Sequence, residues 1–173
     1  MECIMPPQIA MIIEAETDNR ARTLADLRLM IKVHGGTATP TTYLFQKKGR
    51  IAFEKSENGL GTDEILDDAI EAGAEDVEAD EDGGIVVWTK PSMAYSAAEA
   101  LSKSHGLKVA STDIIWDPNQ DTQVEIPEDN LESLGAFLDE LQDNPTVQGI
   151  YANVTQGSLR EDLYNSLREK LDA

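Results

Sequence analysis

The segment that decides the fold of this chain, Gln8 to Gly36, reads QIAMIIEAETDNRARTLADLRLMIKVHGG. Its first nine residues are mostly apolar and β-compatible, which predicts a largely buried strand. The polar residues Thr17-Asp18-Asn19 then supply an N-cap, and apolar residues follow at three- and four-residue spacing as far as His34. Gly35-Gly36 ends the predicted helix. The first unit is therefore a strand, a helix and a glycine stop.

A second pattern occupies residues 50–118. Its hairpin signal is Asp80-Glu81-Asp82-Gly83-Gly84, whose glycines tolerate the positive φ of a tight turn. The predicted elements are, in order, a strand at Arg50–Lys55, a helix from Thr62 to Gly73, strands at Val77–Ala79 and Ile85–Thr89, a helix from Pro91 to His105 and a strand at Lys108–Trp116. This β-α-β-β-α-β order is the split βαβ pattern of a ferredoxin-like domain.

A basic segment precedes that pattern. Tyr43-Leu44-Phe45 reads as a short strand, and Lys47-Lys48-Gly49 separates it from the strand at Arg50–Lys55. The glycine favours a turn or a bulge at this point. We therefore expect a hairpin whose turn presents basic side chains.

The C-terminal part of the sequence returns to the pattern of the first unit. It predicts a strand at Thr122–Ile126, a helix at Glu128–Asp143 and a strand at Val147–Val154. Because the strand of the first unit needs partners, we expect this segment to pair with it. The middle domain is then an insertion.

These expectations define a fold class and its boundaries. The predicted fold is α+β, with two α/β-sandwich-type domains. The first is discontinuous, at residues 1–49 and 119–157, and the second is ferredoxin-like, at residues 50–118. A tail helix at residues 158–173 carries leucines at four-residue spacing. We expect it to dock on the domain that it follows, with an oligomer contact as the alternative.

The charge of the chain is strongly negative and unevenly distributed. Its 173 residues hold 14 Lys/Arg and 33 Asp/Glu, a net charge of −19. Residues 1–55 hold eight bases and six acids, a net charge of +2, and residues 56–173 hold the remaining six bases and 27 acids, a net charge of −21. This segregation suggests one surface that faces a polyanion or a ribosome and a repulsive, solubilising surface elsewhere.

Composition excludes several other classes. The longest apolar run, Ile9 to Ile13, is far shorter than the roughly 20 residues that span a bilayer, so no membrane segment is expected. The first residues show no targeting pattern. The single cysteine, Cys3, forbids an internal disulfide. At an expected mobile terminus and with no histidine nearby in sequence, it is also a poor nucleophile.

A row of ordered motifs resembles a known family. The chain carries Thr17-Asp18-Asn19-Arg20-x-Arg22-Thr23, Gly35-Gly36, Tyr43-Leu44-Phe45-x-Lys47-Lys48-Gly49, Glu71-Ala72-Gly73-Ala74-Glu75-Asp76-Val77 and Val147-Gln148-x-Ile150-Tyr151-x-Asn153. Together they resemble the YebC family, which includes bacterial proteins labelled transcriptional regulators and a mitochondrial translational activator of cytochrome c oxidase subunit I. The resemblance implies the same interrupted α+β architecture.

The resemblance also implies an N-terminal helical domain rich in basic residues. Here residues 1–8 occupy the position of the linker that follows such a domain, keeping Glu2 and Pro6 but not the glycines. We expect either that the basic domain is encoded upstream or that this is a shortened paralogue. The segments Thr37–Pro40 and Asp113–Asn119 look more like organellar, fungal-type members, which implies a mitochondrial location.

The function implied is that of a non-enzymatic gene-expression factor. The first hypothesis is a mitochondrial translational activator that acts on the ribosome or messenger RNA. One alternative is a DNA-binding transcriptional regulator, which the acidic balance disfavours. Another is an acidic protein-binding module without nucleic-acid contact, directed at a basic partner such as a ribosomal protein. No cofactor is implied.

The candidate contact residues are the basic side chains of the first part of the chain. Arg20 and Arg22 begin the first helix, where a salt bridge to Asp18 or Asp26 competes with a phosphate contact. Two interpretations remain open for the bases near the turn. They form either a solvated strand edge that discourages pairing or a contact with nucleic acid or the ribosome. The full set is Arg20, Arg22, Arg28, Lys32, Lys47, Lys48 and Arg50.

Other polar features favour structural roles. His34 and His105 each precede a glycine at a predicted helix end, where an imidazole complements the last carbonyl groups. Trp88 and Trp116 lie on predicted strands of the inserted domain, as core or edge residues rather than stacking platforms. No Cys/His spacing for zinc and no acid, base and nucleophile set is present, so neither a metal site nor an active site is expected.

Overall fold

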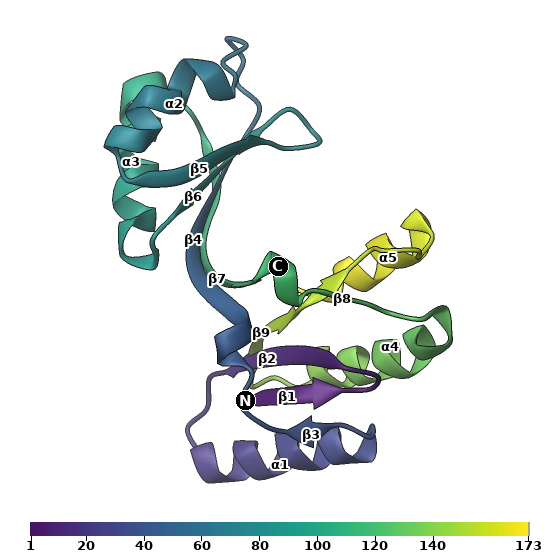
Figure 1. Cartoon of the computed structure of the whole chain (residues 1–173). Coiled ribbons are helices and arrows are strands. Elements are labelled where there is room, and N and C mark those ends of the chain that lie inside the picture. Colours follow the sequence, from purple (N-terminus) through teal and green to yellow (C-terminus); the bar gives the residue numbers. More distant parts are fainter. Residues whose placement is uncertain (173) are drawn as a thin grey trace. The chain divides into compact units, whose positions relative to one another are not determined.

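The computed structural model describes residues 1–172, and the chain divides into two compact units (Figure 1). Unit 1 contains Met1–Gln46 and the segment from Trp116 onward, and unit 2 is Lys47–Ile115. Both boundaries lie three residues before the expected ones, so Trp116 belongs to unit 1. The reason is that β4 (Phe45–Phe53) and β7 (Val109–Pro118) each run unbroken across a boundary.

The sheet of unit 1 has the strand order β3-β1-β2-β9. Its strands are β1 (Glu2–Met5), β2 (Ile9–Ala15), β3 (Thr37–Ala38) and β9 (Val147–Ala152). β9 is antiparallel to β2, with Met11 opposite Ala152 and Ile13 opposite Ile150. The expectation that the C-terminal segment pairs with the first strand is therefore confirmed.

The first residues form a strand, which corrects the expectation of a mobile terminus. β1 pairs antiparallel with β2 along its whole length and with β3 on its other edge. Cys3 and Met5 alternate into the core and are 0% and 2% exposed. The strand could not be recognised from the sequence, because β1 is stabilised by strands elsewhere in the chain and its own apolar pattern is short.

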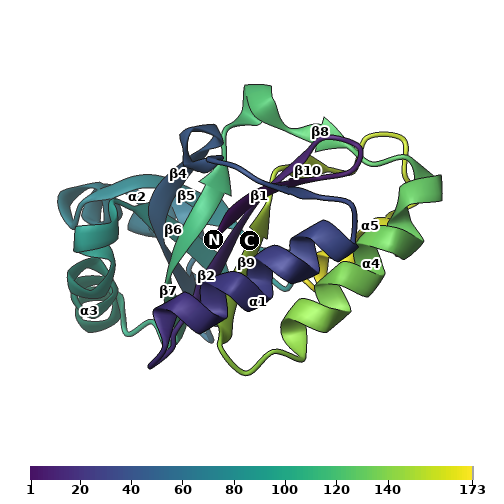
Figure 2. The ribbon, with the colours of Figure 1, turned by 90° about the horizontal axis from the view of Figure 1, so that it is seen from below.

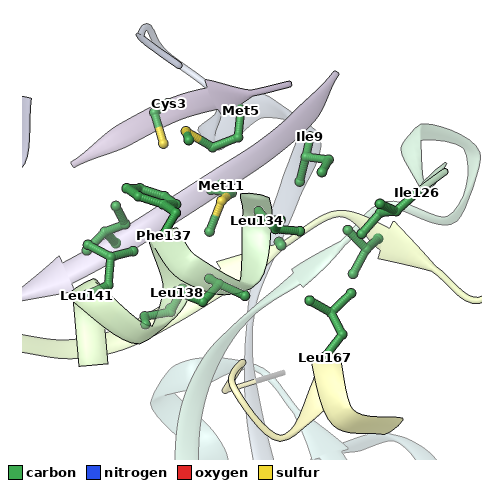
Figure 3. Packing of buried hydrophobic residues seen from close by; sticks show 14 of the residues in the cluster. Cys3, Met5, Ile9, Met11, Ile126, Leu134, Phe137, Leu138, Leu141 and Leu167 are labelled. Carbon is green, nitrogen blue, oxygen red and sulfur yellow. The ribbon is translucent and has the colours of Figure 1, made fainter. Parts of the chain in front are cut away.

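Two helices supply the core of unit 1 over one face of this sheet. α1 (Arg20–Val33) and α4 (Glu128–Gln142) lie side by side in Figure 2. Leu27 and Ile31 of α1 join a cluster with Phe137 of α4 and with β1 and β2. Figure 3 shows Phe137 beside the side chains of β1 and β2. Within residues 1–172, no helix is long and apolar enough to cross a membrane.

The C-terminal segment docks on unit 1. β8 (Val124–Glu125) pairs in parallel with β10 (Val154–Thr155), and the tail helix is α5 (Glu161–Arg168). α5 begins three residues later than the predicted helix and ends at Arg168. Beyond this end the chain bonds back to β9, where Asp172 N–H donates to Ile150 O at 2.8 Å. Leu159 and Leu167 are buried in the core, so this segment is part of unit 1.

Unit 2 has the ferredoxin-like arrangement. Its order is β4, α2 (Thr62–Glu71), β5 (Ala74–Ala79), β6 (Ile85–Thr89), α3 (Ala94–His105) and β7, and its sheet reads β5-β6-β4-β7. The first and third strands are central, as in interleaved βαβ units. Both helices cover the core, to which Ile65 and Ala69 of α2 and Ala97 and Leu101 of α3 contribute. The predicted fold class is confirmed.

The expected basic hairpin at Lys47-Lys48-Gly49 is wrong. These residues lie inside the continuous strand β4, and Thr42–Leu44 is a short 3-10 turn. Gly49 pairs with Thr89 of β6. A Cβ at Gly49 would lie 2.4 Å from Thr89 Oγ1 and 2.7 Å from Ala94 Cβ. The glycine therefore permits a close approach of neighbouring segments rather than a turn.

Glu2 anchors the turn that precedes β4. The backbone N–H groups of Thr41 and Thr42 donate to Glu2 Oε1 at 2.8 and 2.7 Å, and the Thr42 hydroxyl also donates to it. The hydroxyl bond and the two backbone bonds lower the pKa of this carboxyl. Because a lowered pKa means that folding favours the ionised form, the bonds stabilise the fold above the usual glutamate pKa of 4.5.

We expect Glu2→Gln to lower the free energy of unfolding by about 1 kcal/mol at neutral pH, with allowance for solvent screening of a partly exposed group. The difference should shrink as the pH falls below 4.5 and vanish once the pH lies below the lowered pKa of the folded state, where the wild-type carboxyl is also neutral. Urea unfolding followed by circular dichroism at several pH values measures this. Glu132→Gln, at an exposed position of α4, is the matched control. A wild-type advantage that does not depend on pH would contradict the role of the charge.

Candidate nucleic-acid interface

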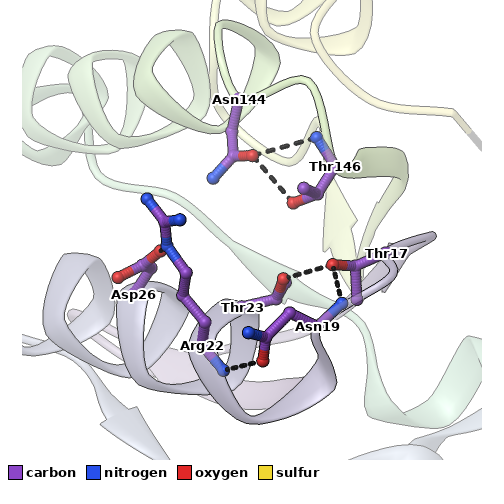
Figure 4. Close-up of polar contacts among 7 residues, drawn as sticks. All are labelled: Thr17, Asn19, Arg22, Thr23, Asp26, Asn144 and Thr146. Carbon is purple, nitrogen blue, oxygen red and sulfur yellow. Dashed lines mark hydrogen bonds and ion pairs between the residues drawn. The ribbon is translucent and has the colours of Figure 1, made fainter.

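Polar side chains fix the start of α1. Asn19 is the N-cap and its Oδ1 accepts from Arg22 N–H at 3.1 Å. Thr17 Oγ1 accepts from Asn19 N–H at 3.1 Å and from the Thr23 hydroxyl at 2.8 Å (Figure 4). The predicted cap is confirmed. Much of the first motif therefore sets where and in which direction the helix begins.

α1 turns an apolar face inward and a basic face outward. Thr23, Leu27 and Ile31 are buried. Arg28 and Lys32 are exposed one helical turn apart, and so lie on one outer face. The helix carries four bases and one acid, a net charge of +3 in a chain of −19. In the described part of the chain, Arg20, Arg28 and Lys32 form no side-chain hydrogen bond or ion pair.

Arg22 has an intramolecular partner instead. Its Nε lies 3.8 Å from Asp26 Oδ2, and the two side chains are 81% and 59% exposed. An exposed pair at this spacing contributes only about 0.3–0.5 kcal/mol. The pair borders a pocket of about 450 Å³ that is also lined by Asp18, Glu140 and Asp143. With four carboxylates and one arginine, this pocket disfavours a phosphate.

The remaining candidates lie in unit 2, whereas Arg20, Arg22, Arg28 and Lys32 lie in unit 1. Lys47, Lys48 and Arg50 belong to β4, where Arg50 pairs with Trp88 of β6. Lys48 Nζ lies 5.7 Å from the centroid of the Trp88 ring. Such cation–π contacts are worth about 0.5–1 kcal/mol at exposed sites. Sequence reasoning missed Trp88 as the cross-strand neighbour of these bases, because the neighbour depends on the register of β4 against β6.

The imidazole rings of His34 and His105 bond to carboxylates rather than to helix-end carbonyl groups, which corrects that expectation, although the backbone of His34 is the C-cap of α1. His34 Nε2 lies 2.6 Å from Glu140 Oε2, and its ring packs on Phe137 with the ring centroids 5.3 Å apart. His105 Nε2 lies 2.6 Å from Asp68 Oδ2. Each imidazole thus joins two helices, α1 to α4 or α3 to α2. Among residues 1–172, no group of three His, Cys, Asp or Glu is placed to hold a metal ion.

Cys3 is chemically protected. Its burial raises the pKa of the thiol to about 12. A thiol nucleophile reacts as the thiolate, so this residue is unreactive at neutral pH. Its contribution is to the core, where it packs with Met5 and Phe137.

The late motif is also structural, and Asn153 shows why. Asn153 is 2% exposed. Its Oδ1 accepts from Ala10 N–H at 2.8 Å, and its Nδ2 donates to Thr122 O at 2.7 Å. The side chain thus ties β2 to the segment before β8. The available signal was a polar residue, Asn153, directly after the apolar run Ile150–Ala152.

Comparisons with known proteins agree with this architecture. A family model described as the TACO1/YebC second and third domain matches residues 1–154. A probable transcriptional regulatory protein of Lacticaseibacillus casei is 34% identical over 149 residues, which are 84% of this chain and 60% of that protein. One from Pseudomonas putida is 36% identical over 151 residues, 86% of this chain and 58% of that protein.

A solved structure gives the same result. The crystal structure of a conserved protein from Aquifex aeolicus aligns with a TM-score of 0.70 and 31% identity, and the match covers 92% of this chain and 66% of that one. Fold and motifs define the class: an α+β protein with an inserted ferredoxin-like unit. The chain belongs to the YebC family. It spans about 60% of the length of the relatives named above.

We expect Asn153→Ala to lower the free energy of unfolding by about 2–3 kcal/mol, because it leaves a buried N–H group and a carbonyl group unpaired. Denaturant unfolding of the whole chain measures the change. Asn165→Ala, at an exposed position of α5, should stay within about 0.5 kcal/mol of wild type. Equal stabilities of the two variants would show that the bonds of Asn153 contribute nothing.

Proposed function

We propose that this chain is part of a gene-expression factor of the YebC type that acts in mitochondrial translation, on the ribosome or messenger RNA. The observation that carries the proposal is the outer face of α1. Arg28 and Lys32 are exposed there, with no acid bonded to them in the described chain. Bases presented in this way are suited to phosphate groups, whose counterions they displace.

The contact would be small. Lys48 packs over Trp88, and the pocket beside Arg22 is rich in carboxylates. Electrostatic attraction and repulsion fade over a Debye length of about 8 Å at physiological salt, so the basic face attracts phosphates even though the chain is acidic overall. The α1 face would then position the protein rather than read a base sequence.

Family membership supports a regulatory role rather than a catalytic one. The relatives carry names of probable transcriptional regulatory proteins. Those names favour the second candidate, a DNA-binding regulator. The mitochondrial location rests on the resemblance of Thr37–Pro40 and Asp113–Asn119 to organellar members.

We expect Arg28→Glu/Lys32→Glu to weaken binding of a fluorescent single-stranded RNA and to reduce the slope of log K against log salt by about 1.4, since each lost phosphate contact removes about 0.7. Fluorescence anisotropy at several salt concentrations measures both. Lys90→Glu/Lys103→Glu, in unit 2, changes the net charge equally and is the matched control. Equal losses in the two variants would contradict a site on α1.

Two further measurements separate the candidates. Tighter binding of duplex DNA than of RNA, with the same dependence on Arg28 and Lys32, would favour the transcriptional role. Sedimentation with mitochondrial ribosomes tests the translational role. We expect the wild-type chain to co-sediment and the α1 variant to do so less. Absence of the wild-type chain from the ribosome fraction would contradict a direct ribosomal contact.

A further inference from the structure

The outer face of α2 exposes apolar side chains that its own packing does not use. α2 buries Ile65 and Ala69. Leu66 and Ile70 follow one position further round the helix and are 41% and 58% exposed. They are four residues apart, so they are neighbours on one side of the helix. The stability of unit 2 does not explain this pair, since burial of apolar area is what stabilises a fold.

The surroundings of this pair are acidic. Residues 56–89 hold twelve Asp/Glu and no Lys or Arg. By helical spacing, Asp63 and Asp67 flank Leu66 and Ile70 on the side away from the core. Glu71 stands in the last turn, where the helix dipole disfavours a carboxylate. Such a charge is stabilised by a positively charged neighbour.

Only some of these acids have a structural role. Asp68 is held by His105 at 2.6 Å, and Glu64 Oε2 accepts from Gly61 N–H at 2.8 Å at the start of the helix. In the chain from residue 1 to 172, the side chains of Asp63, Asp67 and Glu71 have no hydrogen-bonded or ion-paired partner. The apolar pair and these three carboxylates therefore form one unpartnered surface, called here the α2 face.

We propose that the α2 face docks a basic amphipathic segment of a partner protein. Apolar side chains of the segment cover Leu66 and Ile70, and its Lys or Arg side chains meet the three carboxylates. RNA, DNA and an anionic lipid surface all carry the wrong charge for this face. A second copy of this chain that met this face with its own α2 would bring like carboxylates together, and these repel each other. The surface belongs to unit 2 and does not depend on the contacts of α1.

The test uses the whole chain and a fluorescent synthetic peptide with leucines at helical spacing on one face and lysines elsewhere. We expect Leu66→Ser/Ile70→Ser to weaken binding about tenfold, and Asp63→Asn/Asp67→Asn to do the same. The matched control is Leu29→Ser/Val33→Ser, a pair with the same spacing on α1 that is 61% and 71% exposed. That control should bind like the wild type.

Three outcomes would overturn the proposal. One is equal binding of a peptide with the same composition but with its leucines spread around the helix, because this would show attraction by charge alone. Another is self-association of the wild-type chain that the Leu66/Ile70 variant abolishes. The third is unchanged peptide binding in both α2 variants. Because Asp63 and Asp67 are exposed, the asparagine variant decides the matter should the serine variant fail to fold.

Discussion

The antiparallel pairing of β2 with β9 is the contact on which unit 1 depends. It joins Met11 to Ala152 and is reinforced at its two ends by Glu16 N–H to Thr146 O and by the side chain of Asn153. The two strands can pair although they are far apart in sequence, because the chain enters unit 2 through β4 and leaves it through the neighbouring strand β7. The two ends of the folded insertion therefore lie next to each other, so unit 2 lengthens the connection between β2 and β9 only a little. The entropic cost of closing a loop also depends only weakly on the length of the loop.

Local patterns predicted the elements that local chemistry determines. The Asn19 cap, the turn at Gly83 with φ 83° and the left-handed Gly106 after α3 all follow from what these residue types do at element ends. The failures have non-local causes. β1 is a strand because β2 and β3 flank it, and Gly49 is a glycine because Thr89 and Ala94 crowd it. Neither fact is visible in a short window of sequence.

The candidate site was predictable only within one helix. Spacing places Arg28 and Lys32 together on α1, and the structure agrees. Spacing cannot show that Lys48 meets Trp88, since that contact depends on the register of β4 against β6. Nor can it show that His34 reaches Glu140, 106 residues away. Contacts between side chains of different helices or strands are thus the part of a site that a single sequence does not predict.

The two helices with exposed apolar pairs differ in sign of charge. α1 carries Leu29 and Val33 with a net charge of +3, and α2 carries Leu66 and Ile70 with five acids and no base. Exposed leucine, isoleucine and valine attract any apolar surface, so they cannot choose a partner alone. The charged side chains within about 8 Å of such a pair determine which partner binds, because more distant charges are screened. An acidic whole chain is therefore compatible with one helix that attracts polyanions and another that rejects them.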